Sequence, residues 1–262
     1  VGLSNGLWQY DLKKDRFEKY KSSPTYNHRT ISDRVRVIHE DENQDLWIGT
    51  YAGIYLINPD KDLFLHLEHN KLNPYSLKQN SIYSIFEDRA GNIWFGSWWG
   101  GLNYLDRNFD NFLHYNETNG LSSSIVSSFV EDDFGNFWIG TEGGGVNYFD
   151  RSKKAFQVFK HDINNTNSLA LNNVQDLEVY LNDRLIIATH GRGIDIATID
   201  KGQLYFQHFT HDPTDPNSLS SNWVTTLEVD ANNRIWIGTI DGGLNQFLLE
   251  EKRFIRYAEN TT

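Results

Sequence analysis

The sequence predicts an all-β fold, a β-propeller built of four-stranded antiparallel blades. A strand–turn–strand motif recurs along the chain, its copies follow one another at a regular period, and each copy contains several short aromatic and β-branched runs. The motif is complete at residues 131–150, where Asp133, Gly135 and Asn136 form a tight turn before the run from Phe137 to Thr141. Glycines 143–145 then separate that run from the next one.

The period is set by a tryptophan in the second strand of each copy. Trp47, Trp94, Trp138 and Trp236 occupy the same place in four copies, and Ile186 takes that place in a fifth copy. Successive copies are about 44 to 50 residues apart, the length of one four-stranded propeller blade. The chain therefore predicts one blade per copy.

The first 30 residues match only the second half of a repeat. Residues 6–11 correspond to residues 145–150, and residues 17–20 correspond to residues 156–159. We expect the first two strands, A and B, to be missing from this half blade.

The remaining chain holds five fuller repeats, each with strands A to D. Strand A has apolar residues three apart in segments too short for a helix, so we expect a strand with a β-bulge. Strand B is the Trp-Ile-Gly-Thr run, strand C follows the glycine turn, and strand D has a Phe-x-x-aromatic/Leu pattern. The predicted blades are residues 31–79, 80–123, 124–171, 172–220 and 221–262.

About five and a half blades make residues 1–262 one segment of a larger propeller. We expect its ring not to close on itself, with edges exposed or matched by another chain or by sequence outside this segment. The chain has no Met and starts within a motif, which indicates an excised piece of a longer protein.

Composition excludes several classes of partner and chemistry. The net charge of −11 and the pI near 5.2 argue against nucleic acid, heparin-like polyanions and anionic membranes as main partners, unless a local basic patch overrides the average. There is no Cys, which excludes disulfides and thiol catalysis. No apolar run reaches the roughly 20 residues of a membrane helix, so we expect no membrane insertion in this segment.

Most recurring motifs have a structural explanation. The Asp-x-x-Gly-Asn turns are too short for an EF-hand loop, so we expect structural turns rather than calcium sites. The repeated Trp residues should fill the core between blades. The nine His residues include no His-x-x-x-His or His-Glu-x-x-His pattern, and we expect neither a metal nor another cofactor.

The connections between strands B and C are the candidate ligand site. In an antiparallel blade these turns share one face with the links from D to the next A. They also vary between repeats, as specificity residues on a fixed scaffold do. Exposed aromatic rings beside polar groups suit sugar binding. The candidates are Trp98 and Trp99 for stacking, Tyr51 at the margin, and Glu142, His190, Arg192 and Asp241 for polar contacts.

Two alternatives remain open for these residues. The adjacent Trp98 and Trp99 could equally pack against a neighbouring subunit or propeller. His190 and Arg192 could be a solvated loop pair.

The pattern resembles the two-component regulator propeller repeat. The resemblance covers nearly all the chain and rests on residues 88–97, 132–141 and 230–239, each followed by a Gly-Gly-aliphatic-Asn step. It departs at residues 180–189, which lack the turn motif and the Trp, and in the number of blades, which is usually seven. The family implies the extracellular or periplasmic sensor region of a hybrid histidine kinase, with an oligosaccharide or similar polar ligand and with kinase output elsewhere.

Three functions follow from these observations. The favoured one is a non-enzymatic sensor segment on the periplasmic or extracellular side, which passes its signal by repacking against further blades or against a second copy in a homodimer. A propeller lyase or other glycan-acting enzyme is one alternative, although no catalytic set is apparent at a diagnostic spacing. A protein-interaction propeller without a small ligand is the other.

Overall fold

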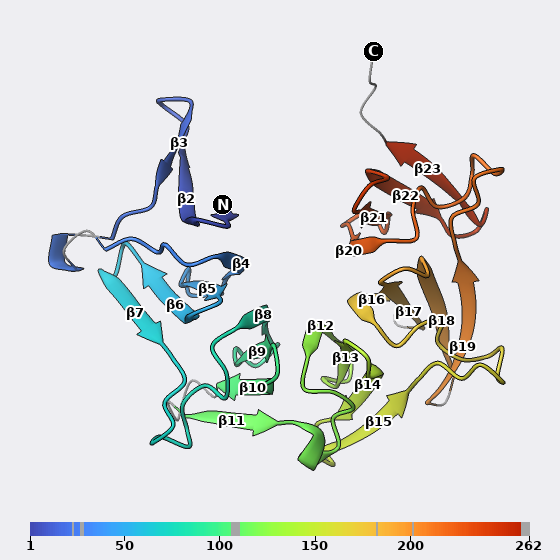
Figure 1. The fold of residues 1–262 in the computed structure, drawn as a ribbon, viewed down its shortest axis with the longest axis horizontal. Coiled ribbons are helices and arrows are strands. Elements are labelled where there is room, and N and C mark those ends of the chain that lie inside the picture. The colour runs from blue at the N-terminus through green and yellow to red at the C-terminus, as the bar shows by residue number, and fades with distance from the viewer. Residues whose placement is uncertain (23, 27–28, 106–110, 182, 201, 258–262) are drawn as a thin grey trace. The chain divides into compact units, whose positions relative to one another are not determined.

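The computed structural model describes residues 1–22, 24–26, 29–105, 111–181, 183–200 and 202–257, and it confirms the all-β propeller fold (Figure 1). One three-stranded and five four-stranded antiparallel sheets form the blades. Helix in the described residues is limited to two 3₁₀ turns, η1 (Pro24–Tyr26) and η2 (Glu117–Asn119), as expected. The chain forms two compact units, residues 1–119 with 124–126, and residues 120–123 with 127–262.

The first unit contains three sheets, in which strands adjacent in sequence are adjacent in space. The strands are β1 (Gly2–Leu3), β2 (Gly6–Asp11), β3 (Arg16–Lys19), β4 (Val35–Glu40), β5 (Leu46–Thr50), β6 (Gly53–Asn58), β7 (Leu63–Leu67), β8 (Ile82–Glu87), β9 (Ile93–Ser97), β10 (Gly101–Leu105) and β11 (Phe112–Tyr115).

The second unit contains the other three sheets, in the same order of strands, although the first residue of β12 belongs to the first unit. The strands are β12 (Val126–Glu131), β13 (Phe137–Thr141), β14 (Gly145–Asp150), β15 (Ala155–Phe159), β16 (Val174–Tyr180), β17 (Arg184–Thr189), β18 (Ile194–Asp200), β19 (Gln203–Phe209), β20 (Val224–Val229), β21 (Ile235–Thr239), β22 (Leu244–Leu248) and β23 (Arg253–Tyr257).

The expected bulge in strand A is present. The pairing of β4 with β5 skips one residue between Val35 and Val37, and the pairing of β8 with β9 skips one between Ile82 and Ser84. The pairings β16–β17 and β20–β21 shift at the same place. One extra residue in strand A explains the helix-like spacing of its apolar residues.

The first blade is larger than predicted. Gly2 and Leu3 form β1 and pair with Leu7 and Gly6 of β2, so the end of strand B is present. A Cβ on Gly2 would lie 2.4 Å from Val35 Cγ1, just as one on Gly49 would lie 2.8 Å from Ile82 Cγ2. Gly2 thus occupies the glycine position of the Trp-Ile-Gly-Thr run, which the repeat pattern did not reveal because only the last residues of that run are in the chain.

The turn aspartate and the strand-B tryptophan form one structural unit. Asp41 Oδ1 accepts backbone N–H bonds from Asn43 and Asp45, and its Oδ2 accepts the indole N–H of Trp47 at 2.7 Å. Asp88 and Asp230 bind their own tryptophans in the same way, at 3.0 Å. The turn carboxylate is therefore occupied by hydrogen bonds within the blade, which confirms its structural role.

The tryptophans fill the core, with one partial exception. Trp47, Trp94 and Trp138 are buried, and Trp47 contacts Phe95 of the next sheet with ring centroids 5.6 Å apart. Trp236 is only partly buried, and its ring contacts Tyr257 of its own sheet. The prediction of a core position therefore holds for three tryptophans and only in part for Trp236.

Candidate functional site

The first unit carries a cluster of stacked aromatic and arginine side chains at its B–C turns. We call it the aromatic–arginine cluster. Its members come from β4 and the residue before it, from β8, and from the turns that follow β5 and β9. They are Arg34, Arg36, Tyr51, Tyr83, Trp98 and Trp99.

The contacts of the aromatic–arginine cluster run from one blade to the next. Arg36 lies over the rings of Tyr51 and Tyr83, with its guanidinium carbon 4.0 and 3.7 Å from the two centroids. Tyr83 stacks on Trp98 at 5.0 Å, and Trp98 meets Trp99 edge to face at 6.5 Å. The predicted residues Tyr51, Trp98 and Trp99 are thus connected through two residues that the sequence did not indicate, Arg36 and Tyr83.

Trp99 stands at a position where other blades have glycine. Its φ is 64°, in the left-handed region, and the corresponding Gly143 and Gly191 have φ values of 75° and 110°. A bulky residue in this conformation costs about 1–2 kcal/mol relative to glycine. The ring is nevertheless 68% exposed, so packing within the described structure does not offset that cost. Strain of this kind at an exposed aromatic residue is typical of a functional position.

The polar candidates of the second unit lie at three turns, with His190 and Arg192 sharing the turn after β17. His190 packs edge to face against Trp223 with centroids 4.6 Å apart, and its backbone N–H donates to Asn173 O. Its Nδ1 is buried and has no hydrogen-bond partner among the described residues. Trp223, which lies just before β20, was not predicted. Asp241 is exposed in the turn after β21, and Glu142 is partly buried in the turn after β13.

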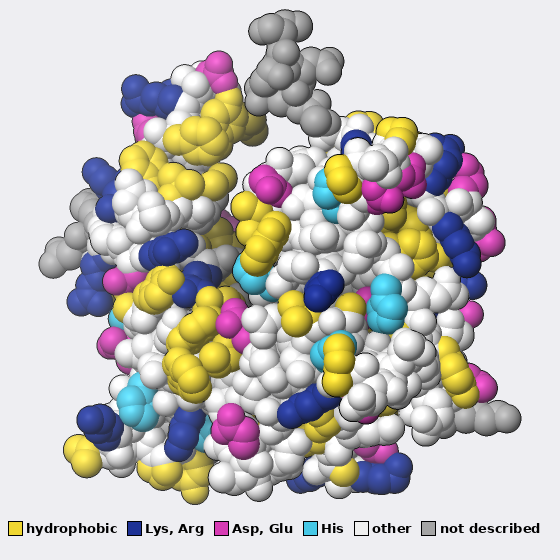
Figure 2. Space-filling view, turned by 45° about the vertical axis from the view of Figure 1, so that its right-hand side comes forward, with side chains coloured by type: hydrophobic (Ala, Val, Ile, Leu, Met, Phe, Trp, Pro, Cys, Tyr) yellow, Lys and Arg dark blue, Asp and Glu magenta, His cyan; other side chains and the backbone are white. Residues whose placement is uncertain are grey.

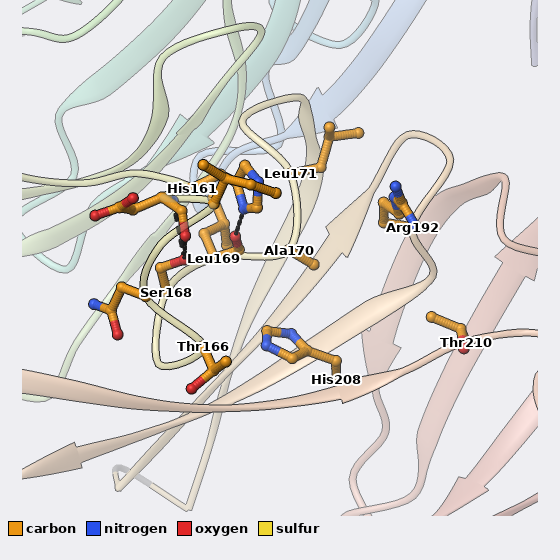
Figure 3. Close-up of a pocket in the computed structure, with 12 residues that line it drawn as sticks. His161, Thr166, Ser168, Leu169, Ala170, Leu171, Arg192, His208 and Thr210 are labelled. Atoms are coloured by element: carbon orange, nitrogen blue, oxygen red, sulfur yellow. Dashed lines mark hydrogen bonds between the residues drawn. The ribbon is translucent and has the colours of Figure 1, made fainter.

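Arg192 lies at a cavity of about 440 Å³ in the second unit (Figure 3). The side chain comes from the turn after β17, whereas His208 comes from β19 and Thr166 from the link before β16. His208 Nδ1 lies 2.7 Å from the carboxylate of Asp195, which is fully buried. This hydrogen bond raises the pKa of His208 and favours its protonated form. Arg192 therefore places a positive charge at this cavity, and the hydrogen bond to Asp195 favours a second one on His208.

Asp195 stands where the other complete blades have asparagine or, in the first of them, tyrosine. Asn147 and Asn245 accept the backbone N–H of Ser122 and Ser220, and Asp195 accepts that of Ala170 in the same way. The loss of the Trp from this repeat was visible in the sequence, but nothing in the pattern indicated the buried charge.

The seven predicted contacts are divided between the units. Tyr51, Trp98 and Trp99 belong to the first, and the other four belong to the second. Their assembly into one ligand site stays a prediction. Within the described residues no three His, Asp or Glu side chains lie close enough to hold a metal ion. None of the described helices is long and apolar enough to cross a membrane.

The repeats match a known family model. The model of the two-component regulator propeller matches residues 31–52, 76–99, 120–143 and 218–241. The chain carries two-component regulator propeller repeats. The four matched segments each end in a B–C turn. The repeat that lacks the turn motif and the Trp, around residues 180–189, is not among them.

Solved structures share the propeller fold at low sequence identity. Two of them are structures of the extracellular domain of BT4673 from B. thetaiotaomicron, which one describes as a hybrid two-component system and the other as a one-component system. They align at 18% and 19% identity, with TM-scores of 0.54 and 0.56. These alignments cover 98% and 100% of this chain but 40% and 41% of the BT4673 chains, so this chain spans about two fifths of their length.

Two further structures extend the comparison beyond signalling proteins. PorZ of Porphyromonas gingivalis, a surface component of the type-IX secretion system, aligns at 20% identity and a TM-score of 0.68 over 94% of this chain and 36% of PorZ. The Cps50 (Swd1) propeller domain of Myceliophteria thermophila aligns at 11% identity and 0.67, over 100% of this chain and 82% of that domain. No curated protein matches. At these identities the structures establish the fold alone.

Proposed function

We propose that this chain is a segment of an extracytoplasmic sensor in a two-component signalling protein, and that it binds a carbohydrate or similar polar ligand. The regulator propeller repeats and the likeness to the extracellular domain of BT4673 support the sensor function. The ligand contacts are the B–C turn residues, with Trp99 as the main stacking surface. Binding changes how the blades pack against further propeller or against a second copy of the protein.

Trp99 is the observation that carries this proposal. The indole ring is exposed and strained at a glycine position, and its ring contact among the described residues is the edge-to-face one with Trp98, so it contributes little to folding. A flat aromatic surface of this kind stacks on the C–H face of a sugar ring. The neighbouring Trp98 is held by its stacking on Tyr83 and gives the site a rigid wall.

Replacing Trp99 by glycine separates binding from folding. Because glycine is the residue found at this turn position in two other blades, Trp99→Gly should leave thermal stability unchanged or slightly raised. Saccharide binding, measured by calorimetry on the full-length protein, should become weaker by about 1–3 kcal/mol of binding free energy if the ring is a buried contact in the complex. Trp98→Ala should also weaken binding, but with some loss of stability because Tyr83 loses its stacking partner.

Phe134→Ala is the matched control. Phe134 is an aromatic residue that is 86% exposed in an A–B turn, away from the B–C turns, and its removal should not alter affinity. Unchanged affinity in both the Trp98 and Trp99 variants would show that the site is placed wrongly.

A further inference from the structure

We propose that the ligand of the aromatic–arginine cluster is an acidic saccharide, with a carboxylate or sulfate group held by Arg36 and with Arg34 beside it. This inference rests on the proposed function and narrows its ligand class. The charges of these two arginines have no partner in the described structure.

Arg36 is held in place but makes no hydrogen bond to the described residues. Its guanidinium packs on the rings of Tyr51 and Tyr83, and cation–π contacts at these distances stabilise the charge. Its Nε is buried without a hydrogen-bond partner. The two Nη atoms also lack partners in the described part of the chain, and neither is among its fully buried atoms without a partner. The stacked rings therefore fix a guanidinium whose terminal N–H groups remain available.

Three other arginines of the chain illustrate the usual pairing of a guanidinium with polar groups. Arg151 Nη1 lies 3.3 Å from Glu131 Oε1, and Arg234 Nε lies 2.6 Å from Asp230 Oδ2. Arg256 donates to backbone carbonyl groups instead, among them Ser218 O at 2.8 Å. Unlike these three arginines, Arg36 makes no hydrogen bond or ion pair to the described residues.

Arg34 adds a second positive charge at the same ring. Its guanidinium carbon lies 5.5 Å from the centroid of Tyr51, and the side chain has no ion pair in the described residues. Two unpaired cations against one ring repel each other, and a bound anion relieves that repulsion. A guanidinium fork also matches the two oxygens of a carboxylate or sulfate.

The charge of the whole chain limits the size of this anion. A net charge of −11 disfavours long polyanions. On the face shown in Figure 2, positive and negative side chains are interspersed over the coloured residues rather than gathered in one basic patch. A short saccharide with one or two acidic groups fits such a local site better than a polymer does.

The test is calorimetry on the full-length protein with a panel of saccharides of equal length. Oligogalacturonate supplies carboxylates, and its methyl ester keeps the same sugar rings without the charge. A sulfated oligosaccharide tests sulfate in place of carboxylate as the acidic group. A neutral glucan completes the panel as a saccharide without charge. We expect at least one acidic saccharide to bind, and its uncharged counterpart to bind at least about tenfold more weakly.

Arg36→Gln should weaken binding of the acidic saccharide at least about tenfold, with little effect on any residual binding of the neutral ones. Arg34→Gln is the second variant, because Arg34 is exposed and its replacement removes only a contact with the Tyr51 ring at 5.5 Å. Circular dichroism checks that each variant is folded.

The outcomes distinguish this inference from the proposed function. If neutral and acidic saccharides bind equally, and the two arginine variants bind as the wild type does, the charge inference is wrong. The proposed function then survives provided that Trp99→Gly still weakens binding. If no saccharide of the panel binds, both proposals are overturned.

Discussion

Replacing Gly145 by alanine is expected to lower the free energy of unfolding by about 3 kcal/mol or more. Gly145 opens β14 with φ of 76°, where a side chain already costs about 1–2 kcal/mol. A Cβ at this position would also lie 2.3 Å from the carbonyl oxygen of Phe159, which is backbone and cannot rotate away. The two penalties fall on the same residue, so the strand pair β14–β15 would have to separate.

Gly202→Ala is the matched control for this change. Gly202 has nearly the same φ, 79°, but a Cβ added there would have no atom within 4 Å. Its replacement should therefore cost only the conformational penalty, about 1–2 kcal/mol. Chemical denaturation of both variants measures the difference, and equal destabilisation would show that the close approach of Phe159 is unimportant.

Asp195→Ala is expected to destabilise the protein by about 2–4 kcal/mol. The carboxylate is fully buried and accepts two hydrogen bonds, from Ala170 N at 2.7 Å and from His208 Nδ1 at 2.7 Å. Truncation leaves the Ala170 N–H without its acceptor, opens a small cavity and removes the partner of the histidine.

The Asp195 variant should also lose a pH dependence. Asp195 raises the pKa of His208 in the folded state, so the stability that this pair contributes is complete below the ordinary histidine pKa of about 6.5. It is lost as the pH rises through the raised folded-state value. The penalty of Asp195→Ala should therefore be larger at about pH 6 than at about pH 9 in thermal melts.

Asp195→Asn is the control, because Asn103 and His114 form the same pair in the first unit at 3.0 Å. There burial lowers the histidine pKa instead of raising it. The asparagine variant should cost less than the alanine variant and show little of the pH dependence. A penalty for Asp195→Ala that stays constant between the two pH values would contradict this account of the pair.

Much of the fold could be predicted from sequence because most repeats contain the residues that form the turn between strands A and B. In three repeats the aspartate that opens the turn and the tryptophan six residues later are linked by a hydrogen bond, so their spacing identified both the turn and the core strand. In the repeat of Asp132 and Trp138 this bond is absent, and Asp132 accepts a hydrogen bond from the hydroxyl of Tyr148 instead. The first blade was underestimated because Gly2 and Leu3 are too few residues to show a motif.

The candidate site was less predictable, because its contacts join residues from different repeats. Tyr51, Trp98 and Trp99 could be selected as departures from the repeat. Arg36 and Tyr83 lie within strand A, where nothing in the local pattern distinguishes them from other partly exposed strand residues. Only the packing of β4 beside β8 brings them to the tryptophan pair.

The proposed binding of an acidic saccharide at the B–C turns of the first unit can be checked by a crystal structure of the full-length protein with the saccharide that binds. We expect a sugar ring stacked on Trp99 and an acidic group within hydrogen-bond distance of the terminal nitrogens of Arg36. A saccharide bound elsewhere, with Trp99 and Arg36 both free of contact, would show that the proposed site is wrong.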